Sequence, residues 1–499
     1  MRKYIFMISA ALMLNTFNSC SDRELELTPP AEDLTNGTLA SAEKLQQILN
    51  GAYLSIGNSS ALGTELLLFG DLLGDKIYNS NLKANFLITY DFNYNGNQNQ
   101  FGFYGTMYRT IINCNTVINN TAVPASDEVI KMKGQAKILR GIAYYYLVSY
   151  YSPTPTSGVN QDYGVPLVLG DYDVNIQPAR ATVAQVYNQI VADLTDGMQH
   201  TDNPDSALKK VMVGPDVAKI VLARTLLTRR AAGDAELALQ YATEVKDNAP
   251  DDAFRANGIF TASDYINYWK GVDDLQYEGH PETIWELDMG PKSNAVMNIG
   301  ANGCLPVYYG VGDATRRSLL ANATFFDSFG SYLESPLDMR RGGTLANINT
   351  GLFSNQAVPA DTPRGYWINK YPRLTSSGNF YRNIRIFRYS EANLLRIEAL
   401  RLTNQTALAL TELNEFAQSR GGLQYTGADL LNDILTEKSK EFYGEGQRFL
   451  DLKRYGLGVH RPSNCNTCDL EANDHRFVLP VAQSAINSNP NLKQYPGYL

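Results

Sequence analysis

The sequence predicts a helix-dominated fold, in which tetratricopeptide-like helical pairs form a scaffold that carries a loop-rich lobe with a few short strands. Two observations lead to this prediction. Apolar residues recur with a 3.6-residue period at both ends of the chain, over residues 31–250 and 384–499. Between them, over about residues 251–383, the period fails and Gly, Asn, Pro and Tyr are frequent. Because long irregular segments inside compact domains usually carry function, we expect functional residues in this lobe.

The helical pairs are clearest in the middle of the chain. Thr182 and Gln185 have the spacing of a capping box, and an apolar stripe follows them. Pro215 is expected to open the next helix, because its missing N–H costs nothing in the first turn. Gly233 is expected to end that helix, and a third helix follows at once. Two short antiparallel helices joined by a tight turn form a tetratricopeptide-like unit.

Further elements follow from the same patterns. Helices are predicted at residues 42–53, 106–118, 131–151, 388–402 and 405–419, and a short strand is predicted at Thr283–Leu287. The spacing between the helical pairs is irregular. The sequence therefore predicts a bent helical array rather than a regular solenoid.

The N-terminus has the pattern of a lipoprotein signal peptide. Arg2 and Lys3 precede an apolar run at residues 4–14, which is too short to span a bilayer because a spanning helix needs about 20 residues. Cys20 follows, and the small Ser19 before it suits lipoprotein cleavage. We predict a signal peptide at residues 1–19, a linker at 20–30 anchored to lipid through acylated Cys20, and one domain at 31–499. The alternative is an ordinary secretory signal with a coincidental cysteine.

The charge and cysteine content limit which partners and which metal or disulfide sites we expect. The chain has 43 basic and 51 acidic residues and no lysine/arginine block, so we expect no nucleic-acid partner. Cys465 and Cys468 form a lone CxxC among Pro, Ser, Asn and Asp. Zinc would need two more ligands, and the nearby His460 and His475 lack finger-like spacing. The pattern favours a disulfide in a loop, and we predict neither a metal site nor a cofactor.

Catalytic motifs are scarce. Ser41–Lys44 spells SxxK, but no KTG follows and Ser41 stands where a helix N-cap is expected. HExxH, GxSxG, Walker A and GxGxxG motifs are missing from the sequence. We predict that the protein is not an enzyme. A lipid-anchored glycoside hydrolase stays open as the alternative, because a sequence does not reveal which carboxylates face each other.

Five segments, taken together, resemble the SusD/RagB family of nutrient-binding outer-membrane lipoproteins. They lie at residues 134–147, 163–168, 388–399, 437–454 and 479–498, in the family's order and over nearly the whole mature chain. The resemblance implies four tetratricopeptide-like pairs and an outer-membrane location. It also implies a SusC-type TonB-dependent transporter as partner and a glycan ligand, with a peptide ligand as in RagB as the alternative. The acidic segment 21–26 resembles the tag that sends such lipoproteins to the cell surface.

The charged residues of segment 437–454 could be read as an acid/base cluster. On a helix and the turn after it, however, such residues more often form buried ion pairs and hydrogen bonds to helix ends. We expect this structural role for Glu437, Glu441, Glu445, Arg448, Asp451 and Lys453.

Aromatic and planar polar residues outside the helical stripes are the candidates for ligand contact, because sugars stack on rings and pair with amides and carboxylates. One group lies before the helix at 106–118 and comprises Asp75, Tyr78, Tyr94, Asn97 and Phe101. The lobe provides Trp269, Tyr308 and Tyr309 and, further on, Tyr366 and Trp367. The resemblance implies ligand contact in the first group and around Tyr308. Many relatives have a tryptophan near the position of Phe103, which is missing here.

Overall fold

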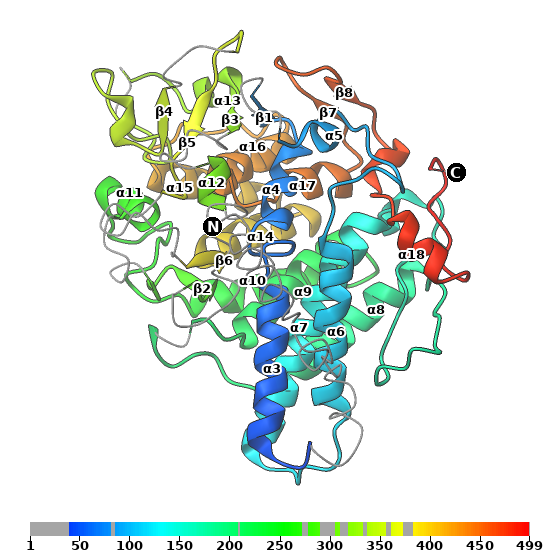
Figure 1. The fold of residues 1–499 in the computed structure, drawn as a ribbon. Coiled ribbons are helices and arrows are strands. Elements are labelled where there is room, and N and C mark those ends of the chain that lie inside the picture. Colours follow the sequence, from blue (N-terminus) through cyan, green and yellow to red (C-terminus); the bar gives the residue numbers. More distant parts are fainter. Residues whose placement is uncertain are drawn as a thin grey trace, which may run out of the picture.

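The computed structural model describes residues 39–80, 85–207, 210–271, 278–289, 305–309, 318–332, 337–355, 361–372 and 383–498. Helices dominate this part of the chain, which confirms the predicted fold class. In Figure 1, helix α3 projects downward from the body, and the lobe lies at the upper left in yellow-green. The last part of the chain, with β7, β8 and α18, lies on the opposite side of the molecule from the lobe.

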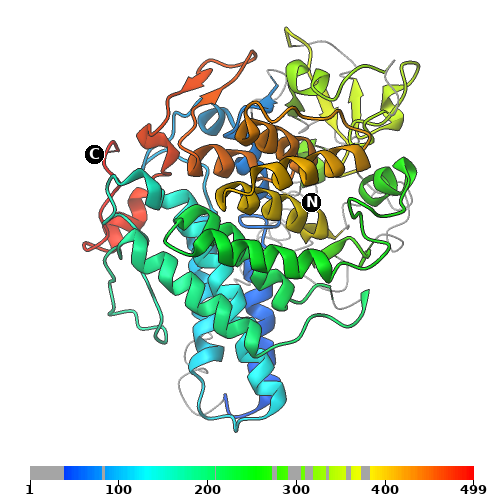
Figure 2. The ribbon, with the colours of Figure 1, turned by 180° about the vertical axis from the view of Figure 1, so that it is seen from behind.

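The scaffold is an array of helices that pack side by side. It comprises α3 (Ala42–Ile56), α4 (Glu65–Leu72), α5 (Leu87–Tyr90), α6 (Phe103–Asn119), α7 (Asp127–Tyr151), η2 (Pro155–Ser157), α8 (Val183–Gln199), α9 (Pro215–Arg229), α10 (Asp234–Asp247), α14 (Tyr389–Leu402), α15 (Thr406–Ser419), α16 (Leu430–Phe442), α17 (Arg448–Arg454), η6 (His475–Phe477) and α18 (Gln483–Ser488). From α6 to α10 each helix packs on the next one, and α10 packs directly on α14. The segment between α10 and α14 therefore projects out of the array, as Figure 2 shows from behind.

The lobe is built from short elements. It comprises α11 (Ala262–Lys270), β2 (Thr283–Leu287), α12 (Leu305–Tyr309), β3 (Leu319–Ala321), α13 (Ala323–Asp327), η5 (Ile348–Thr350), β4 (Phe353–Asn355) and β5 (Tyr366–Ile368). Strand β1 (Ile77–Asn79) joins it in an antiparallel sheet with the order β1-β3-β5-β4. The predicted strand β2 pairs with β6 (Ile384–Arg388), and β7 (Val459–His460) pairs with β8 (Asp469–Leu470).

Several helix ends follow from local sequence. Thr182 and Gln185 form the predicted capping box, and Ser41 caps α3 through its hydroxyl. Pro215 is the first residue of α9. The prediction that Gly233 ends α9 was wrong. Helix α9 ends at Arg229, and Gly233, with φ of 82°, directly precedes α10, because a short turn here needs a left-handed residue before the next helix.

Glycines allow close packing of α7 on α8. A Cβ atom on Gly134 would lie 2.7 Å from the His200 carbonyl oxygen, and one on Gly197 would lie 2.8 Å from the Gly134 carbonyl oxygen. Both distances are shorter than real Cβ contacts. Beside them, Leu194 of α8 is fully buried over Gly141 of α7. The two helices therefore touch through backbone and apolar atoms over much of their length.

The lobe is attached to the scaffold by buried charges. Arg340 donates to Asp338 Oδ2 at 2.7 Å and to Glu437 Oε1 at 2.5 Å, and its side chain is 0% exposed. Lys370 Nζ lies 2.8 Å from Glu445 Oε1 and is also 0% exposed. Burial lowers the pKa of Lys370 to about 8, against the nearby carboxylates that favour its charged form.

Arg388, the last residue of β6, joins the same cluster. Its Nη1 lies 2.6 Å from Glu441 Oε1, and its Nε lies 2.8 Å from Glu445 Oε2. Burial alone would raise the pKa of Glu441, but Arg420, Arg388 and Arg340 together hold it well below its usual range.

The second half of segment 437–454 also has a structural role. Asp451 accepts from Lys438 at 2.8 Å, and Arg448 binds Asp75 through Nε at 2.7 Å. Lys453 donates to the Ser149 and Ser152 carbonyl oxygens at the end of α7, at 2.6 and 2.7 Å. The prediction of buried ion pairs and helix-end hydrogen bonds is confirmed for this segment.

Candidate functional site

Two half-buried aromatic rings from distant parts of the chain meet where the scaffold joins the lobe. Phe86 directly precedes α5, and Tyr308 lies on α12. Their ring centroids are 4.9 Å apart with an angle of 65° between the ring planes. Both side chains keep part of their surface exposed. We call this pair the aromatic platform.

Buried rings support the platform from behind. Phe69 of α4 is fully buried and packs edge-on against Phe86 at 5.6 Å and against Phe101 at 5.4 Å. Phe101 in turn packs edge-on against Tyr94 at 5.1 Å. Because interiors of this kind are close-packed, the platform rests on a rigid support.

Amide side chains surround the platform. Gln100 accepts from the Thr89 hydroxyl at 3.0 Å and donates to the Asn85 carbonyl oxygen at 3.1 Å. The Asn85 side chain donates to the Ser318 hydroxyl at 3.2 Å, beside strand β3. Asn97 is exposed in the same loop. The amides of Asn85 and Gln100 thus fix the chain beside Phe86, and Asn97 is an exposed amide on the loop that carries Gln100.

A half-buried carboxylate holds the loop that carries Asn97. Glu65 Oε2, on α4, accepts from the Gly102 N–H at 2.7 Å, directly before α6. A carboxylate at a helix N-terminus is favoured by the helix dipole and by the free N–H groups there. Burial nevertheless raises the pKa of Glu65 to about 7, against the lowering effect of the Gly102 and Phe103 N–H groups.

The β7–β8 hairpin fastens the back of the site. Arg461 donates to the carbonyl oxygens of Leu72 and Gly74, both at 3.0 Å, and its guanidinium lies 4.1 Å from the Tyr90 ring centroid. At the tip of the hairpin the Asn466 side chain donates to Asp91 Oδ2 at 2.9 Å. Cys465 and Cys468 form a disulfide in this tip.

The structure places most of the first predicted group in the interior. Asp75 is held by Arg448 and Lys76, which keep its pKa below the usual range although burial alone would raise it. The Tyr78 hydroxyl donates to Asp361 at 3.1 Å. Tyr94 and Phe101 are buried. Only Asn97 of this group is exposed, and it lies on the same loop as Gln100 of the platform rim.

Most of the predicted ligand-contact residues of the lobe are also buried. Trp269 and Tyr309 are 0% exposed, with the Lys370 ammonium 4.4 Å from the Trp269 ring centroid. Trp367 is buried in β5, and the Tyr366 ring stacks on Phe326 at 3.7 Å. In this conformation the rings of Trp269, Tyr309 and Trp367 pack the interior, whereas Tyr308 is half-buried.

Sequence reasoning missed Phe86. It lies in the polar loop between two predicted candidates, Tyr78 and Tyr94, and an aromatic residue in such a loop was the available signal. Its partner Tyr308 lies more than two hundred positions away in the chain. The contact between them is a tertiary one that no local pattern reveals.

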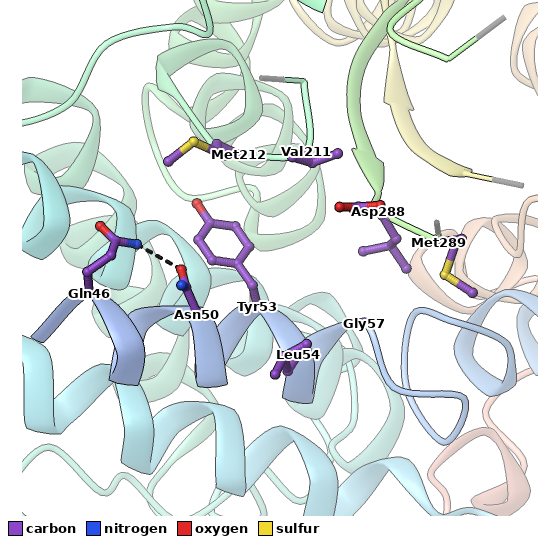
Figure 3. Close-up of a pocket in the computed structure, with 10 residues that line it drawn as sticks. Gln46, Asn50, Tyr53, Leu54, Gly57, Val211, Met212, Asp288 and Met289 are labelled. Carbon is purple, nitrogen blue, oxygen red and sulfur yellow. Dashed lines mark hydrogen bonds between the residues drawn. The ribbon is translucent and has the colours of Figure 1, made fainter. Parts of the chain in front are cut away.

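A separate pocket of about 570 Å³ lies away from the platform residues, between α3, Val211–Met212 and the end of β2 (Figure 3). None of the predicted site residues lines it. Leucine, methionine, valine and tyrosine side chains make up most of its described lining. Such a lining does not suit a ligand covered with hydroxyl groups.

Comparison with known families covers both halves of the chain. The family described as "Starch-binding associating with outer membrane" matches residues 25–213, and the SusD family matches residues 339–498. The chain belongs to the SusD/RagB family. A SusD-like protein of Bacteroides ovatus is 25% identical over 389 residues, which are 71% of this chain and 65% of that relative. The starch-binding protein SusD of Bacteroides thetaiotaomicron is 28% identical over 123 residues, 23% of this chain and 22% of that protein.

Solved structures share the SusD-like fold. A SusD superfamily protein from Bacteroides thetaiotaomicron aligns with a TM-score of 0.76 at 24% identity, over 91% of this chain and 100% of that one. A putative sugar binding protein from Bacteroides vulgatus aligns with a TM-score of 0.77 at 23% identity, over 92% and 99%. Surface glycan-binding protein A from Bacteroides uniformis aligns with a TM-score of 0.69 at 20% identity, over 91% and 99%.

The described residues contain neither a membrane-spanning helix nor a cluster of metal ligands. In the described ranges, no helix has the length and apolar character needed to cross a bilayer. In the same part of the chain, no three histidine, cysteine, aspartate or glutamate side chains gather where they could hold a metal ion. Cys20 lies outside the described residues.

Proposed function

We propose that this SusD/RagB family protein is a lipid-anchored protein of the outer membrane that binds a glycan at the aromatic platform and delivers it to a SusC-type TonB-dependent transporter. The family's description as starch-binding and the glycan-binding names of similar structures support the ligand class. The observation that carries the proposal is the half-buried Phe86–Tyr308 pair beside the amide side chains of Asn85 and Gln100.

The geometry of the platform suits a sugar chain. Pyranose rings present C–H patches that pack on aromatic faces, while their hydroxyl groups pair with planar amides. Phe86 and Tyr308 provide the rings, and Asn97 and Gln100 lie on the adjacent loop. Since Phe69 and Phe101 support this arrangement from below, little ordering is required when a ligand binds.

We propose binding without turnover. Glycoside hydrolysis requires an acid and a second carboxylate facing the bond that breaks. Three described carboxylates near Phe86 are engaged in the fold, because Glu65 caps α6, Asp75 pairs with Arg448 and Asp91 accepts from Asn466. This arrangement favours a binding protein over the hydrolase alternative.

Calorimetry with plant, host and microbial polysaccharides, and with peptide digests, tests the proposal. For the glycan that binds, Phe86→Ala and Tyr308→Ala should each lower affinity by about 1–3 kcal/mol, or roughly 5- to 150-fold. Tyr172→Ala, which removes a ring that is 62% exposed in a different loop, is the matched control. Unchanged affinity in both platform variants would refute the site. Binding of peptides alone would favour a RagB-type role, and release of cleaved sugars would favour a hydrolase.

The anchor is tested separately. Cys20→Ala should move the protein from the membrane fraction to the soluble fraction and abolish labelling with a radioactive fatty acid. The reason is that acyl chains on this cysteine are the proposed attachment to lipid, at roughly 0.8 kcal/mol for each buried methylene. A variant that still labels and sediments with the outer membrane would show that the anchor lies elsewhere.

A further inference from the structure

Two long uncharged segments, far apart in the chain, lie against each other beside the platform loop. Residues 92–108 and 477–492 contain no Asp, Glu, Lys, Arg or His, although 19% of the whole chain is charged. The Gln483 N–H donates to the Gly96 carbonyl oxygen at 2.7 Å. The contact is close, because a Cβ atom on Gly96 would lie 3.0 Å from Gln494 Nε2. The loop between α5 and α6 is therefore joined to the C-terminal segment that carries α18 (Figure 1).

Amide side chains are concentrated on the first of these segments. Six of the eight residues 93–100 are Asn or Gln. Asn97 and Gln98 are exposed, and Asn95 Oδ1 accepts from both of their backbone N–H groups, at 2.9 and 3.0 Å. An asparagine that binds the backbone two and three residues ahead fixes a turn. The exposed amides of Asn97 and Gln98 therefore extend from a backbone that is already ordered.

Helix α18 continues the same surface. Gln483 Nε2 donates to Asn487 Oδ1 at 2.9 Å, and Asn487 is exposed. Gln494 holds the chain before α18, because its amide accepts from the Val481 N–H at 3.0 Å and donates to the Val481 carbonyl oxygen at 2.7 Å. We call residues 93–100 together with α18 the amide strip. Gln100, at the rim of the platform, is one end of the strip, and α18 is the other.

The amide strip suits hydroxyl groups better than charged groups. An amide both donates and accepts, as a sugar hydroxyl does. Carboxylates and sulfates are instead bound by arginine and lysine, and a charge that loses water beside amides alone is not compensated. Of the charges that bound the two segments, Asp91 accepts from Asn466 at 2.9 Å and Arg476 pairs with Asp474 at 2.8 Å. Lys493 is exposed and lies outside the strip.

We propose that the amide strip is part of the glycan site, and that the ligand is an uncharged polysaccharide that runs from the aromatic platform along residues 93–100 to α18. The inference rests on the proposed glycan binding and adds the charge class of the ligand and a second region of contact. Because a longer chain engages both regions at once, affinity should rise with chain length.

Polysaccharides of different charge test the ligand class. In affinity gels, the Cys20→Ala protein should be retarded by at least one of starch, mannan and β-glucan, and by none of polygalacturonate, alginate and chondroitin sulfate. For the neutral polymer that binds, oxidation of its C6 hydroxymethyl groups to carboxylates should weaken binding at least about 10-fold. Affinity for the unmodified polymer should be the same at about 0.05 and 0.5 M salt, and Lys493→Gln should not change it.

Variants of exposed amides locate the strip. Gln98→Ala and Asn487→Ala should each lower affinity for the same polymer by about 2- to 12-fold, because each removes one hydrogen-bonding group. Tm should stay the same, since both side chains are exposed. Gln418→Ala, which removes an exposed amide on α15, is the matched control. With oligosaccharides of increasing length, the effect of Asn487→Ala should appear only in the longer ones.

The outcomes separate this inference from the proposed function. Retardation by an anionic polysaccharide, or equal affinity for the native and oxidised polymers, would overturn the uncharged class. Unchanged affinity in both Gln98→Ala and Asn487→Ala would overturn the strip. In either case a loss of affinity in Phe86→Ala and Tyr308→Ala would still support glycan binding at the platform. If no polysaccharide binds, the proposed function itself is wrong and the inference falls with it.

Discussion

The contact between α7 and α8 and the boundary between scaffold and lobe differ in how many buried charges they contain. Helices α7 and α8 touch mainly through glycine backbone and buried leucine, as at Gly134 and Leu194, with the buried ion pair of Arg140 and Asp193 beside them. At the boundary with the lobe, Phe353 stacks on Tyr443, and several buried cations, among them Arg340 and Lys370, end on carboxylates of segment 437–454. Apolar contacts tolerate small shifts, whereas a buried ion pair requires its geometry and its full set of hydrogen bonds.

This difference explains where the aromatic platform lies. Its two rings come from opposite sides of the boundary, Phe86 from the scaffold and Tyr308 from the lobe. The distance between the two rings therefore depends on the position of the lobe relative to the scaffold. Buried ion pairs with fixed partners favour one position of the lobe on the scaffold. Apolar contacts alone would allow several positions.

The largest expected effect comes from removing a cation at this boundary. Arg388→Met leaves Glu441 and Glu445 buried without one of their main partners. Breaking a buried pair in this way costs about 3–5 kcal/mol of unfolding free energy. Urea unfolding followed by circular dichroism measures the loss. Arg255→Met is the control, because Arg255 pairs with an exposed Asp251 and should cost less than about 1 kcal/mol.

Two outcomes of this experiment show how much the buried charges at the boundary contribute. If Arg388→Met loses no more stability than Arg255→Met, the charged boundary contributes nothing that apolar packing does not supply, and the contrast between scaffold and lobe fails. A loss of stability together with weaker glycan binding in the fraction that remains folded would link the boundary to the platform.

The next test uses two neighbouring tyrosines of α12. Tyr309 is fully buried and packs on Tyr371 at 5.9 Å, whereas Tyr308 is half-buried at the platform. Tyr309→Ala should destabilise the fold by about 3–5 kcal/mol through the cavity that it leaves. Tyr308→Ala should cost affinity for glycan with little change in Tm. Similar falls in Tm for both variants would place Tyr308 in the core rather than in the site.

Local patterns predicted the scaffold well. The capping box at Thr182, the proline at the start of α9 and the strand Thr283–Leu287 all depend on residues close in sequence, and the structure contains each of them. The charged segment 437–454 could also be interpreted, because so many charges on one short segment require partners inside the protein.

The site was harder to predict because exposure is a tertiary property. Trp269 and Tyr309 lie outside the helical stripes, as surface residues would, but the lobe folds over them and buries both. Phe86 and Tyr308 are brought together only by the seating of the lobe on the scaffold. No periodicity distinguishes a loop aromatic that the fold covers from one that it leaves open.

The smallest expected effect concerns the junction nearest the platform, where Glu65 of the scaffold holds the loop before α6. Burial raises the pKa of Glu65 from 4.5 to about 7, so the folded protein binds this proton more tightly than the unfolded chain does. The resulting stabilisation is complete below about pH 4.5 and is lost as the pH rises through 7. Glu65→Gln keeps an oxygen that can accept from the Gly102 N–H but does not titrate.

The stability difference between the native protein and Glu65→Gln should therefore change with pH in a defined direction. Between pH 4.5 and 7.5 the native protein should lose roughly 1–3 kcal/mol relative to the variant, as measured by urea unfolding at each pH. Glu471→Gln, which removes an exposed carboxylate, should show a much smaller change. A difference that stays flat would mean that water reaches Glu65 and that its carboxylate is held as on a surface. The loop carrying Asn97 would then be fastened by its other contacts, among them those of Gln100 and the hydrogen bond from the Gln483 N–H to the Gly96 carbonyl oxygen at 2.7 Å.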